Sequence, residues 1–287
     1  MPSSRKKRGR TVLVTGASSG IGLELARIYA DHGDGLVLCA RRRQNLDQLA
    51  AEIRQAHAGL DVLVLPADLL DPAAPARIES ALAERGATID VLVNNAGVTN
   101  VGRFVDGDAE RLANLVQLNI ASLTALTRRF LPGMVERGYG RILNVASLAG
   151  FQPVPSMALY AASKAFVLSL TEALSEELRG TGVTVTALCP GLTDTEMVQG
   201  SVDQSQLDQL PSFMLMDAKT VAKAGFRASE TGKVVEVPGV VNEWTANWMR
   251  LQPRWMVRMM GGLAAQTMES TRPRSARPHS ARPRGGR

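Results

Sequence analysis

The stretch that decides the fold is Thr15-Gly16-Ala17-Ser18-Ser19-Gly20-Ile21-Gly22. It follows a short apolar run, Thr11–Thr15, and leads into a helical pattern over residues 21–32. Glycines here allow a tight turn and a close approach of the backbone to a pyrophosphate, and the helix start adds free N–H groups and a positive dipole end. A structural loop that binds nothing is the alternative, but the strand–turn–helix context argues against it. We therefore predict a dinucleotide site that includes Gly16, Ser18, Ser19, Gly20, Ile21 and Gly22.

Short apolar runs alternate with longer helical patterns along the rest of the chain. The expected strands are Thr11–Thr15, Leu36–Ala40, Val62–Pro66, Ile89–Asn94, Arg141–Ala146, Val183–Leu188 and Val234–Val237. The expected helices cover residues 21–32, 43–57, 72–85, 109–137, 157–180 and 218–231. This alternation is typical of α/β proteins. We predict one domain with a doubly wound, Rossmann-type parallel sheet of seven strands and helices on both faces, which binds ligands beyond the carboxyl ends of its strands.

The positive charge lies at the two ends of the chain. The formal net charge is +6, yet residues 1–10 and 271–287 hold eleven of the 33 basic residues and no acid, which leaves 22 bases against all 27 acids between them. We predict a disordered basic segment over 1–10, the folded domain over 11–240, an amphipathic substrate-lid or interface segment over 241–268, and a disordered Arg/Pro-rich tail over 269–287. The tails lack interleaved aromatic residues, so we predict no nucleic-acid partner.

Cysteine and histidine usage excludes several classes of site. Cys39 and Cys189 fall in expected strands, which indicates buried thiols rather than a disulfide or a thiolate metal site. The three histidines have no metal-ligand spacing, so we predict no catalytic metal. No apolar run is long enough to span a membrane, and the start of the chain lacks an export signal. We therefore expect a cytoplasmic protein.

Three arginines, Arg41, Arg42 and Arg43, follow the second expected strand, where no acid is present. An acid at this strand end usually binds a free ribose 2′-hydroxyl, whereas a 2′-phosphate needs guanidinium groups. We predict that the cofactor is NADP(H) and that Arg41 binds its phosphate. Solvated arginines at a helix start are the alternative.

Further motifs follow in order along the chain. Asp68 and Leu69 come after the third expected strand, Asn94-Asn95-Ala96-Gly97 ends the fourth, Ser147 follows the fifth, Tyr160 and Lys164 form a Y-x-x-x-K pair, and Pro190-Gly191 follows the sixth. With the glycine-rich turn, these motifs resemble the short-chain dehydrogenase/reductase family over residues 11–239.

The resemblance implies an oxidoreductase and the roles of individual residues. The implied catalytic residues are Asn119, Ser147, Tyr160 and Lys164. The implied cofactor contacts are Asp68, Leu69, Asn95, Ala96, Gly97, Tyr160, Lys164, Pro190, Gly191, Thr193 and Thr195, with Asn94 supporting the sheet and the cofactor. Thr193 stands where the family commonly has a branched apolar residue.

Tyr160 and Lys164 are four residues apart on a predicted helix, so both side chains project from one face. A nearby ammonium favours the phenolate, and we expect it to bring the pKa of Tyr160 down from near 10. Tyr160 would then transfer the proton that accompanies hydride movement. Ser147 would hydrogen-bond the substrate oxygen, and Asn119 would hold a water that links Lys164 to solvent. A Tyr and Lys at this spacing are otherwise usual on an amphipathic helix, but the accompanying motifs favour the catalytic interpretation.

Two methionine-rich apolar segments, 195–216 and 244–263, predict the substrate. All three tryptophans, Trp244, Trp248 and Trp255, fall in the second, and Leu148, Phe151, Val154 and Met157 lie near Ser147. Such residues can line an apolar pocket. We therefore predict reduction of a ketone to a secondary alcohol on an apolar, acyl or steroid-like substrate.

Alternatives stay open for these segments and for the activity. The apolar segments also fit a subunit interface, core packing or weak contact with a membrane surface, and we predict a homodimer or homotetramer. An NAD(H)-dependent alcohol or hydroxysteroid dehydrogenase acting oxidatively is a second enzyme hypothesis. A non-catalytic nucleotide-sensing scaffold is a third, because a fold alone does not fix function.

Overall fold

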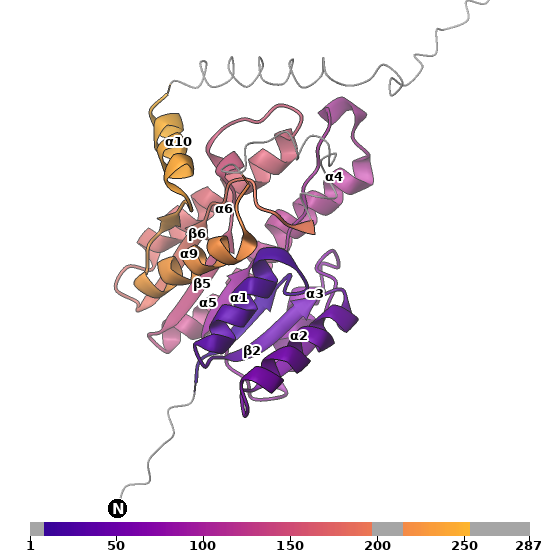
Figure 1. Cartoon of the computed structure of the whole chain (residues 1–287), viewed down its shortest axis with the longest axis vertical. Helices are drawn as coiled ribbons and strands as arrows, with labels where there is room; N and C mark the ends of the chain where they lie inside the picture. The colour runs from indigo at the N-terminus through magenta and orange to yellow at the C-terminus, as the bar shows by residue number, and fades with distance from the viewer. Residues whose placement is uncertain (1–8, 197–214, 253–287) are drawn as a thin grey trace, which may run out of the picture.

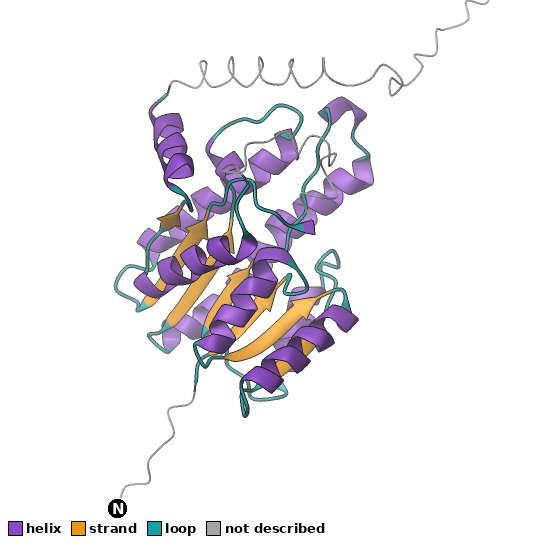
Figure 2. Cartoon of the chain, viewed as in Figure 1, coloured by secondary structure: helices purple, strands orange, loops and turns teal. Residues whose placement is uncertain are grey.

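A parallel sheet of seven strands forms the middle layer of the protein, and helices cover both of its faces (Figures 1 and 2). The computed structural model describes residues 9–196 and 215–252. The strands are β1 (Thr11–Thr15), β2 (Gly35–Ala40), β3 (Val62–Pro66), β4 (Val91–Asn94), β5 (Gly140–Val145), β6 (Val183–Leu188) and β7 (Val235–Glu236). Their order is β3-β2-β1-β4-β5-β6-β7, and every pair is parallel. The predicted doubly wound sheet is therefore confirmed, and its strand order reverses between β1 and β4.

Alternate residues of strand β1 pack into two hydrophobic clusters, one on each face of the sheet. Val12 and Val14 of β1 pack with α1 (Gly20–Asp31), α2 (Arg43–Ala56) and α9 (Ala218–Thr231) on one face. Leu13 packs with α3 (Ala74–Ala83), α5 (Leu123–Glu136) and α6 (Ala158–Glu177) on the other. Because both faces are covered, the strands are apolar without alternation. Helix α10 (Val240–Leu251) follows β7 at the carboxyl end of the sheet (Figure 1).

The predicted continuous helix over residues 109–137 contains a π-helical turn. It comprises α4 (Ala109–Val116), the turn η2 (Gln117–Ser122) and α5. The hydroxyl of Ser122 donates to the Leu118 carbonyl within this turn. A π turn adds one residue to the helical repeat and is common at functional sites, but the apolar periodicity does not reveal it. Two short 3-10 turns, η1 (Phe104–Asp106) and η3 (Leu148–Phe151), were also not predicted.

Arg10, which the sequence analysis assigns to the disordered basic segment over 1–10, makes side-chain contacts within the fold. The Arg10 guanidinium binds both carboxylate oxygens of Asp34, at 2.9 and 2.7 Å, and one oxygen of Glu230 at 2.7 Å. Arg10 thereby links the start of β1 to the loop before β2 and to the end of α9. Residues 1–8 lie outside the described part of the chain.

Both cysteines are buried, as predicted. Burial raises the pKa of the Cys39 thiol to about 12, so this side chain behaves as a small apolar residue.

Candidate active site

A cavity of about 520 Å³ opens at the carboxyl ends of the central strands. It lies where the strand order reverses, which is the expected ligand position in a doubly wound sheet. Eighteen of the predicted site residues line it: Gly16, Ser18, Ser19, Gly20, Ile21, Arg41, Asp68, Leu69, Asn95, Ala96, Gly97, Ser147, Tyr160, Lys164, Pro190, Gly191, Thr193 and Thr195. Gly22 and Asn119 are the two predicted residues outside the lining.

The glycine-rich turn has the geometry that its sequence predicts. Gly16 and Gly20 adopt positive φ angles of 66° and 56°. Gly22 has no room for a side chain, because a Cβ there would lie 2.4 Å from the Gly16 carbonyl oxygen and 2.3 Å from Nδ2 of Asn95. Ser19 precedes α1 without capping it through its side chain. Free N–H groups of the first helical turn therefore remain available to an anion.

Polar side chains hold the ends of β1 and β4 together beneath the cavity. The Thr15 hydroxyl donates to the Val93 carbonyl at 3.0 Å and accepts from the backbone N–H groups of Asn95 and Ala96 at 3.0 and 3.1 Å. The Asn95 amide donates to the carbonyls of Thr15 and Gly16 at 3.0 and 3.2 Å. Asn95 is therefore a structural brace of the glycine turn as well as a cavity residue.

Asn94 supports the sheet through a second group of hydrogen bonds. Its amide donates to the Thr127 hydroxyl at 3.0 Å and to Oδ1 of Asn144 at 2.9 Å, and Asn144 in turn donates to the Thr171 hydroxyl at 2.9 Å. This buried chain of hydrogen bonds ties β4 and β5 to α5 and α6. It fixes α6, which carries Tyr160 and Lys164, against the sheet.

Lys164 is buried beside the cavity with one direct backbone partner. Its ammonium donates to the Val145 carbonyl at 2.8 Å, and Nζ lies 5.8 Å from the centre of the Tyr160 ring. Burial lowers the pKa of Lys164 to about 8. The lysine is thus close to its titration point in the neutral to mildly alkaline range.

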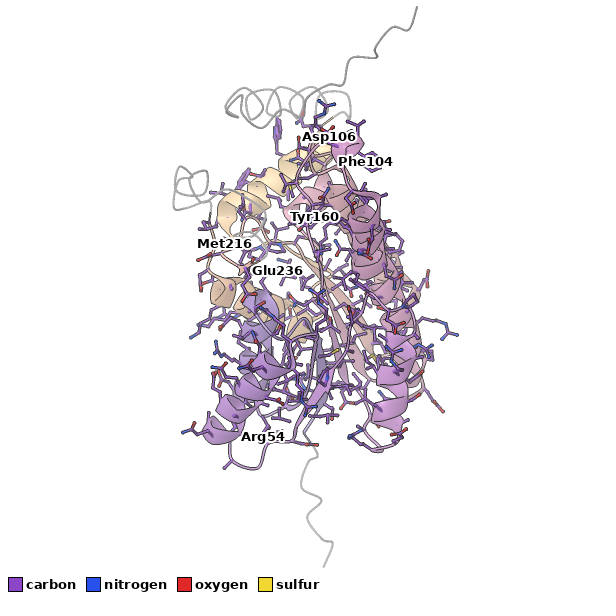
Figure 3. The ribbon with its side chains drawn as sticks, turned by 90° about the vertical axis from the view of Figure 1, so that its right-hand side faces the viewer. Arg54, Phe104, Asp106, Tyr160, Met216 and Glu236 are labelled. Atoms are coloured by element: carbon purple, nitrogen blue, oxygen red, sulfur yellow. The ribbon has the colours of Figure 1, made fainter. Side chains whose placement is uncertain are left out.

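Tyr160 lies toward the carboxyl end of the sheet, below Phe104 in Figure 3. Burial raises the pKa of Tyr160, and a hydrogen bond with Ser147 opposes the rise. The predicted net lowering of the Tyr160 pKa is therefore wrong in direction, because the loss of hydration on burial outweighs the hydrogen bond from Ser147. The phenol stays protonated at neutral pH and can act as a proton donor.

Ser147 is placed by a close contact between η3 and α6. Its hydroxyl accepts from the backbone N–H of Ala149 at 3.1 Å, which caps η3. Gly150 allows this contact, since a Cβ there would lie 2.9 Å from the carbonyl carbon and oxygen of Lys164. The sequence prediction did not include Gly150, whose role depends on a tertiary approach that no local motif shows.

Asn119 lies within the π turn and binds the backbone after β4. Its Oδ1 accepts from the Val98 N–H and its Nδ2 donates to the Val98 carbonyl, both at 2.9 Å. Nδ2 also donates to the Ser163 hydroxyl at 3.1 Å. The side chain thus uses its oxygen and nitrogen to position Val98 and α6, and its predicted role as a water anchor stays a prediction.

The arginine at the end of β2 that contacts the glycine turn is Arg42. Its Nη2 donates to the hydroxyls of Ser18 and Ser19 at 3.2 and 3.0 Å, and it pairs with Oε2 of Glu196 at 2.8 Å. This ion pair lowers the pKa of Glu196. Arg41 also lines the cavity, whereas Arg43 pairs with Asp47 on the surface of α2. The sequence prediction quoted Arg42 within the basic run but did not assign it, and it missed Glu196.

The loop after β6 closes the other side of the cavity. The hydroxyl of Thr193 donates to the Gly191 carbonyl at 3.1 Å. Backbone hydrogen bonds join Met216 to Leu192 and Asp194 at 2.9 Å each. The methyl group of Thr195 would lie 3.0 Å from a Cβ at Gly20, so this loop packs directly on the glycine turn.

The predicted substrate segments are described only in part. Residues 197–214 and 253–287, which include Trp255, lie outside the described residues. Leu148 and Phe151 pack with the core cluster that contains Ala246 of α10. Within residues 9–196 and 215–252, no group of three or more His, Cys, Asp or Glu side chains could hold a metal ion. The helices of those same residues include none with the length and apolarity required to cross a bilayer.

Comparison with known proteins defines the class. The short chain dehydrogenase family profile matches residues 10–206. The chain is 41% identical over 189 residues to a protein named as ketoacyl reductase 1 of the granaticin polyketide synthase from Streptomyces violaceoruber, covering 65% of this chain and 69% of that protein. The chain therefore belongs to the short-chain dehydrogenase/reductase family and is an oxidoreductase of that family.

Solved structures agree with this assignment. A short-chain dehydrogenase from Sphingobium yanoikuyae in complex with NADPH is 35% identical, with a TM-score of 0.75 over 94% of this chain and 99% of that one. A bulky-bulky ketone specific alcohol dehydrogenase from Comamonas testosteroni is 30% identical, with a TM-score of 0.73 over 96% and 98% of the two chains.

Proposed function

We propose that this protein is an NADP(H)-dependent carbonyl reductase that converts an apolar ketone or acyl-type carbonyl to a secondary alcohol. The observation that carries the proposal is a cavity that places Ser147, Tyr160 and Lys164 at the far end of a phosphate-type cradle. The cradle combines a glycine turn, an uncapped helix start and two guanidinium groups. These features fit a phosphorylated dinucleotide.

The cofactor supplies a hydride when it is bound, and the residues of the chain handle the proton and the orientation. Tyr160 holds the proton that the carbonyl oxygen receives, because its raised pKa keeps the phenol protonated. Ser147 hydrogen-bonds the same oxygen as charge develops. Lys164 supports the donor with a positive charge and can bind the ribose, while the loop containing Pro190, Thr193 and Thr195 holds the nicotinamide end.

The preference for NADP(H) rests on Arg41 and Arg42, and Glu196 favours a second candidate. The Glu196 carboxylate lines the same cavity, and a carboxylate can accept a hydrogen bond from a free ribose 2′-hydroxyl. An NAD(H)-dependent dehydrogenase is therefore the alternative. In the structure Glu196 is paired with Arg42, so a 2′-phosphate would compete with this carboxylate for Arg42, while Arg41 also lines the cavity.

We base the substrate class on the relatives, because none of Leu148, Phe151, Val154 and Met157 lines the cavity. One relative is named a ketoacyl reductase, and one structural neighbour is described as specific for bulky-bulky ketones. The test is oxidation of NADPH and NADH, measured in parallel with ketones and oxoacyl thioesters of increasing chain length. We expect NADPH to be preferred and kcat/KM to rise with chain length, since each buried methylene contributes up to about 0.8 kcal/mol. Preference for NADH, or for small polyhydroxylated carbonyls, would reject the proposal.

A further inference from the structure

Ser156 has an unusual backbone conformation. Its φ angle is 63°, and within residues 9–196 and 215–252 it is the one residue other than glycine with a positive φ. The left-handed region is unfavourable for a residue that carries a Cβ, and few residues other than glycine and asparagine adopt it. Such strain persists only where the surrounding structure requires it, and it is concentrated at functional sites.

The strain belongs to a tight turn directly before helix α6. The Met157 N–H donates to the Val154 carbonyl at 3.1 Å, so residues 154–157 form a β-turn with Pro155 and Ser156 at its two central positions. Proline at the first central position and a positive φ at the second define a type II turn, which normally has glycine or asparagine where this chain has serine. Because α6 begins at the next residue, this turn sets the start of the helix that carries Tyr160.

The carbonyl of Ser156 binds a segment that is distant in the sequence. It accepts a hydrogen bond from the backbone N–H of Gly102 at 2.7 Å. Gly102 lies between β4 and α4, and its φ angle of 145° is also one that residues with a side chain rarely adopt. Among the described residues, this is the one backbone hydrogen bond that joins residues 99–107 to another segment. Two unfavourable conformations are thus combined in a single contact.

Apolar packing contributes little to the position of this segment. Phe104, its largest side chain, is 63% exposed. A segment with few buried apolar side chains has low local stability, so its hydrogen bonds largely decide its position. At its start, Asn119 binds both the N–H and the carbonyl of Val98. Residues 99–101 are therefore held at one end by Asn119 and at the other by Ser156.

Residues 99–101 border the catalytic end of the cavity. Thr99 lines the cavity together with Ser147 and Tyr160. Figure 3 shows Phe104, farther along the same segment, on the side of Tyr160 away from Arg54. A substrate bound at Ser147 and Tyr160 therefore shares its space with this segment.

We propose that Ser156 is a positioning residue that holds residues 99–101 against the catalytic end of the cavity, and that this restraint limits the size of the ketone that reaches Tyr160. The inference rests on the proposed carbonyl reduction and adds a residue that determines substrate size. Ser156 is not among the residues that line the cavity, so it acts through the Gly102 N–H and the backbone between Gly102 and the cavity.

Backbone conformation separates variants that keep this hydrogen bond from variants that lose it. Ser156→Asn keeps it, because asparagine tolerates the left-handed region, whereas Ser156→Val loses it, because a β-branched residue does not. Gly102→Ala removes it from the other side, since alanine rarely adopts a φ of 145°. Gly138→Ala is the matched control. Gly138 also has a positive φ, 66°, and space for a Cβ, but it precedes β5 and so lies at the end of the sheet opposite to the cavity.

The first measurement is amide hydrogen exchange at residue 102 of the full chain, which tests the hydrogen bond without any substrate. We expect this amide to exchange about tenfold faster, or more, in Ser156→Val and Gly102→Ala than in the wild-type protein. Ser156→Asn and Gly138→Ala should exchange at the wild-type rate. Equal exchange in all of these proteins would show that Ser156 does not hold this segment, and it would overturn the proposal.

The second measurement is kcat/KM with NADPH for phenyl alkyl ketones whose alkyl group lengthens from methyl to pentyl. Loss of the hydrogen bond gives the longer alkyl groups more room. Ser156→Val and Gly102→Ala should therefore raise kcat/KM for the longest ketone, relative to the methyl ketone, about tenfold, which is comparable to the effect of one methylene in an apolar pocket. Ser156→Asn and Gly138→Ala should keep the wild-type size profile, and the Kd for NADPH should stay unchanged in all variants.

The proposed function and the role of Ser156 fail in different ways. A wild-type enzyme that oxidises no NADPH with any ketone of the series would reject the proposed function. A wild-type enzyme that reduces these ketones, together with Ser156→Val and Gly102→Ala variants that keep its size profile, would reject the positioning role alone. A size profile that shifts equally in Gly138→Ala would assign the effect to general destabilisation and would also overturn that role.

Discussion

At the scale of single residues, burial controls the proton chemistry of the site. Lys164 is 6% exposed and its pKa falls to about 8, whereas burial raises the pKa of Tyr160. The usual order of the two pKa values is therefore reversed: Lys164 loses its proton at a lower pH than Tyr160 does. Between neutral pH and about 8 the site combines a protonated phenol with a charged ammonium, which is the state that suits carbonyl reduction.

The pH profile of reduction should follow from the pKa of Lys164. As pH rises through about 8, Lys164 loses its proton and the positive charge that supports the donor disappears. We expect kcat/KM for ketone reduction to be level below pH 8 and to fall about tenfold per pH unit above it, as a single ionisation requires. The profile is measured with the wild-type enzyme and with Lys164→Met, which should be slow and should lose this decline. A decline that persists in Lys164→Met would assign the ionisation to another group.

The Glu196 carboxylate and a cofactor 2′-phosphate are expected to compete for the Arg42 guanidinium. Arg42→Ala should raise KM for NADPH by about 10- to 100-fold and leave KM for NADH nearly unchanged, since a charge-assisted hydrogen bond contributes about 1.5–3 kcal/mol. Glu196→Gln removes the carboxylate that pairs with Arg42 and should lower KM for NADPH severalfold. The control is Arg43→Ala on the neighbouring surface. A fall in NADH use in Glu196→Gln, with no gain for NADPH, would instead support ribose binding by Glu196.

At the scale of secondary-structure elements, close backbone contacts position the site. The turn after β1, the end of β4 and the start of α1 meet at Gly22, where no Cβ fits. The sequence predicts this junction well, because the glycine spacing is local. It predicts Gly150, the π turn at Asn119 and the Arg42–Glu196 pair poorly, because these depend on how distant elements pack.

Gly22→Ala tests the junction. The added Cβ would lie 2.4 Å from the Gly16 oxygen, so α1 or the turn must shift at a cost of about 1–3 kcal/mol. We expect a lower Tm and a higher Kd for NADPH. Gly133→Ala in α5 is the matched control, because its Cβ would meet only the movable end of Arg137 at 3.0 Å. Equal thermal stability of the two variants would show that the junction tolerates a side chain.

At the scale of the whole molecule, the strand order and the positions of most elements follow from the sequence. The strand β6 and the helix α9 have the predicted bounds, and β1 and β3 do as well. The ion cluster of Arg10 was not predicted, because composition alone does not show whether the last residue of a basic run has ion-pair partners in the fold. Arg10 binds Asp34, 24 residues away along the chain, and Glu230, 220 residues away.

Arg10→Ala is therefore expected to destabilise the protein. Among the residues that the structure describes, it leaves Asp34, which is 3% exposed, with only His32 as a side-chain partner. The cost is about 3 kcal/mol for a largely buried pair, or roughly 6–12 °C in Tm for a domain of this size. Removal of residues 1–8 is the control and should leave Tm nearly unchanged. If both changes have the same effect on thermal unfolding, the cluster does not anchor the fold.

The central claim is that Tyr160 donates the proton in an NADPH-dependent carbonyl reduction. The most direct measurement is the single-turnover rate of NADPH oxidation with an apolar ketone, compared in the wild-type enzyme and Tyr160→Phe, together with the Kd for NADPH of each. Loss of a positioned proton donor removes about 10²–10⁴-fold in rate, and the phenyl ring keeps the packing. We predict a loss within that range and a Kd that changes less than threefold. A variant that retains most of the wild-type rate would contradict the account.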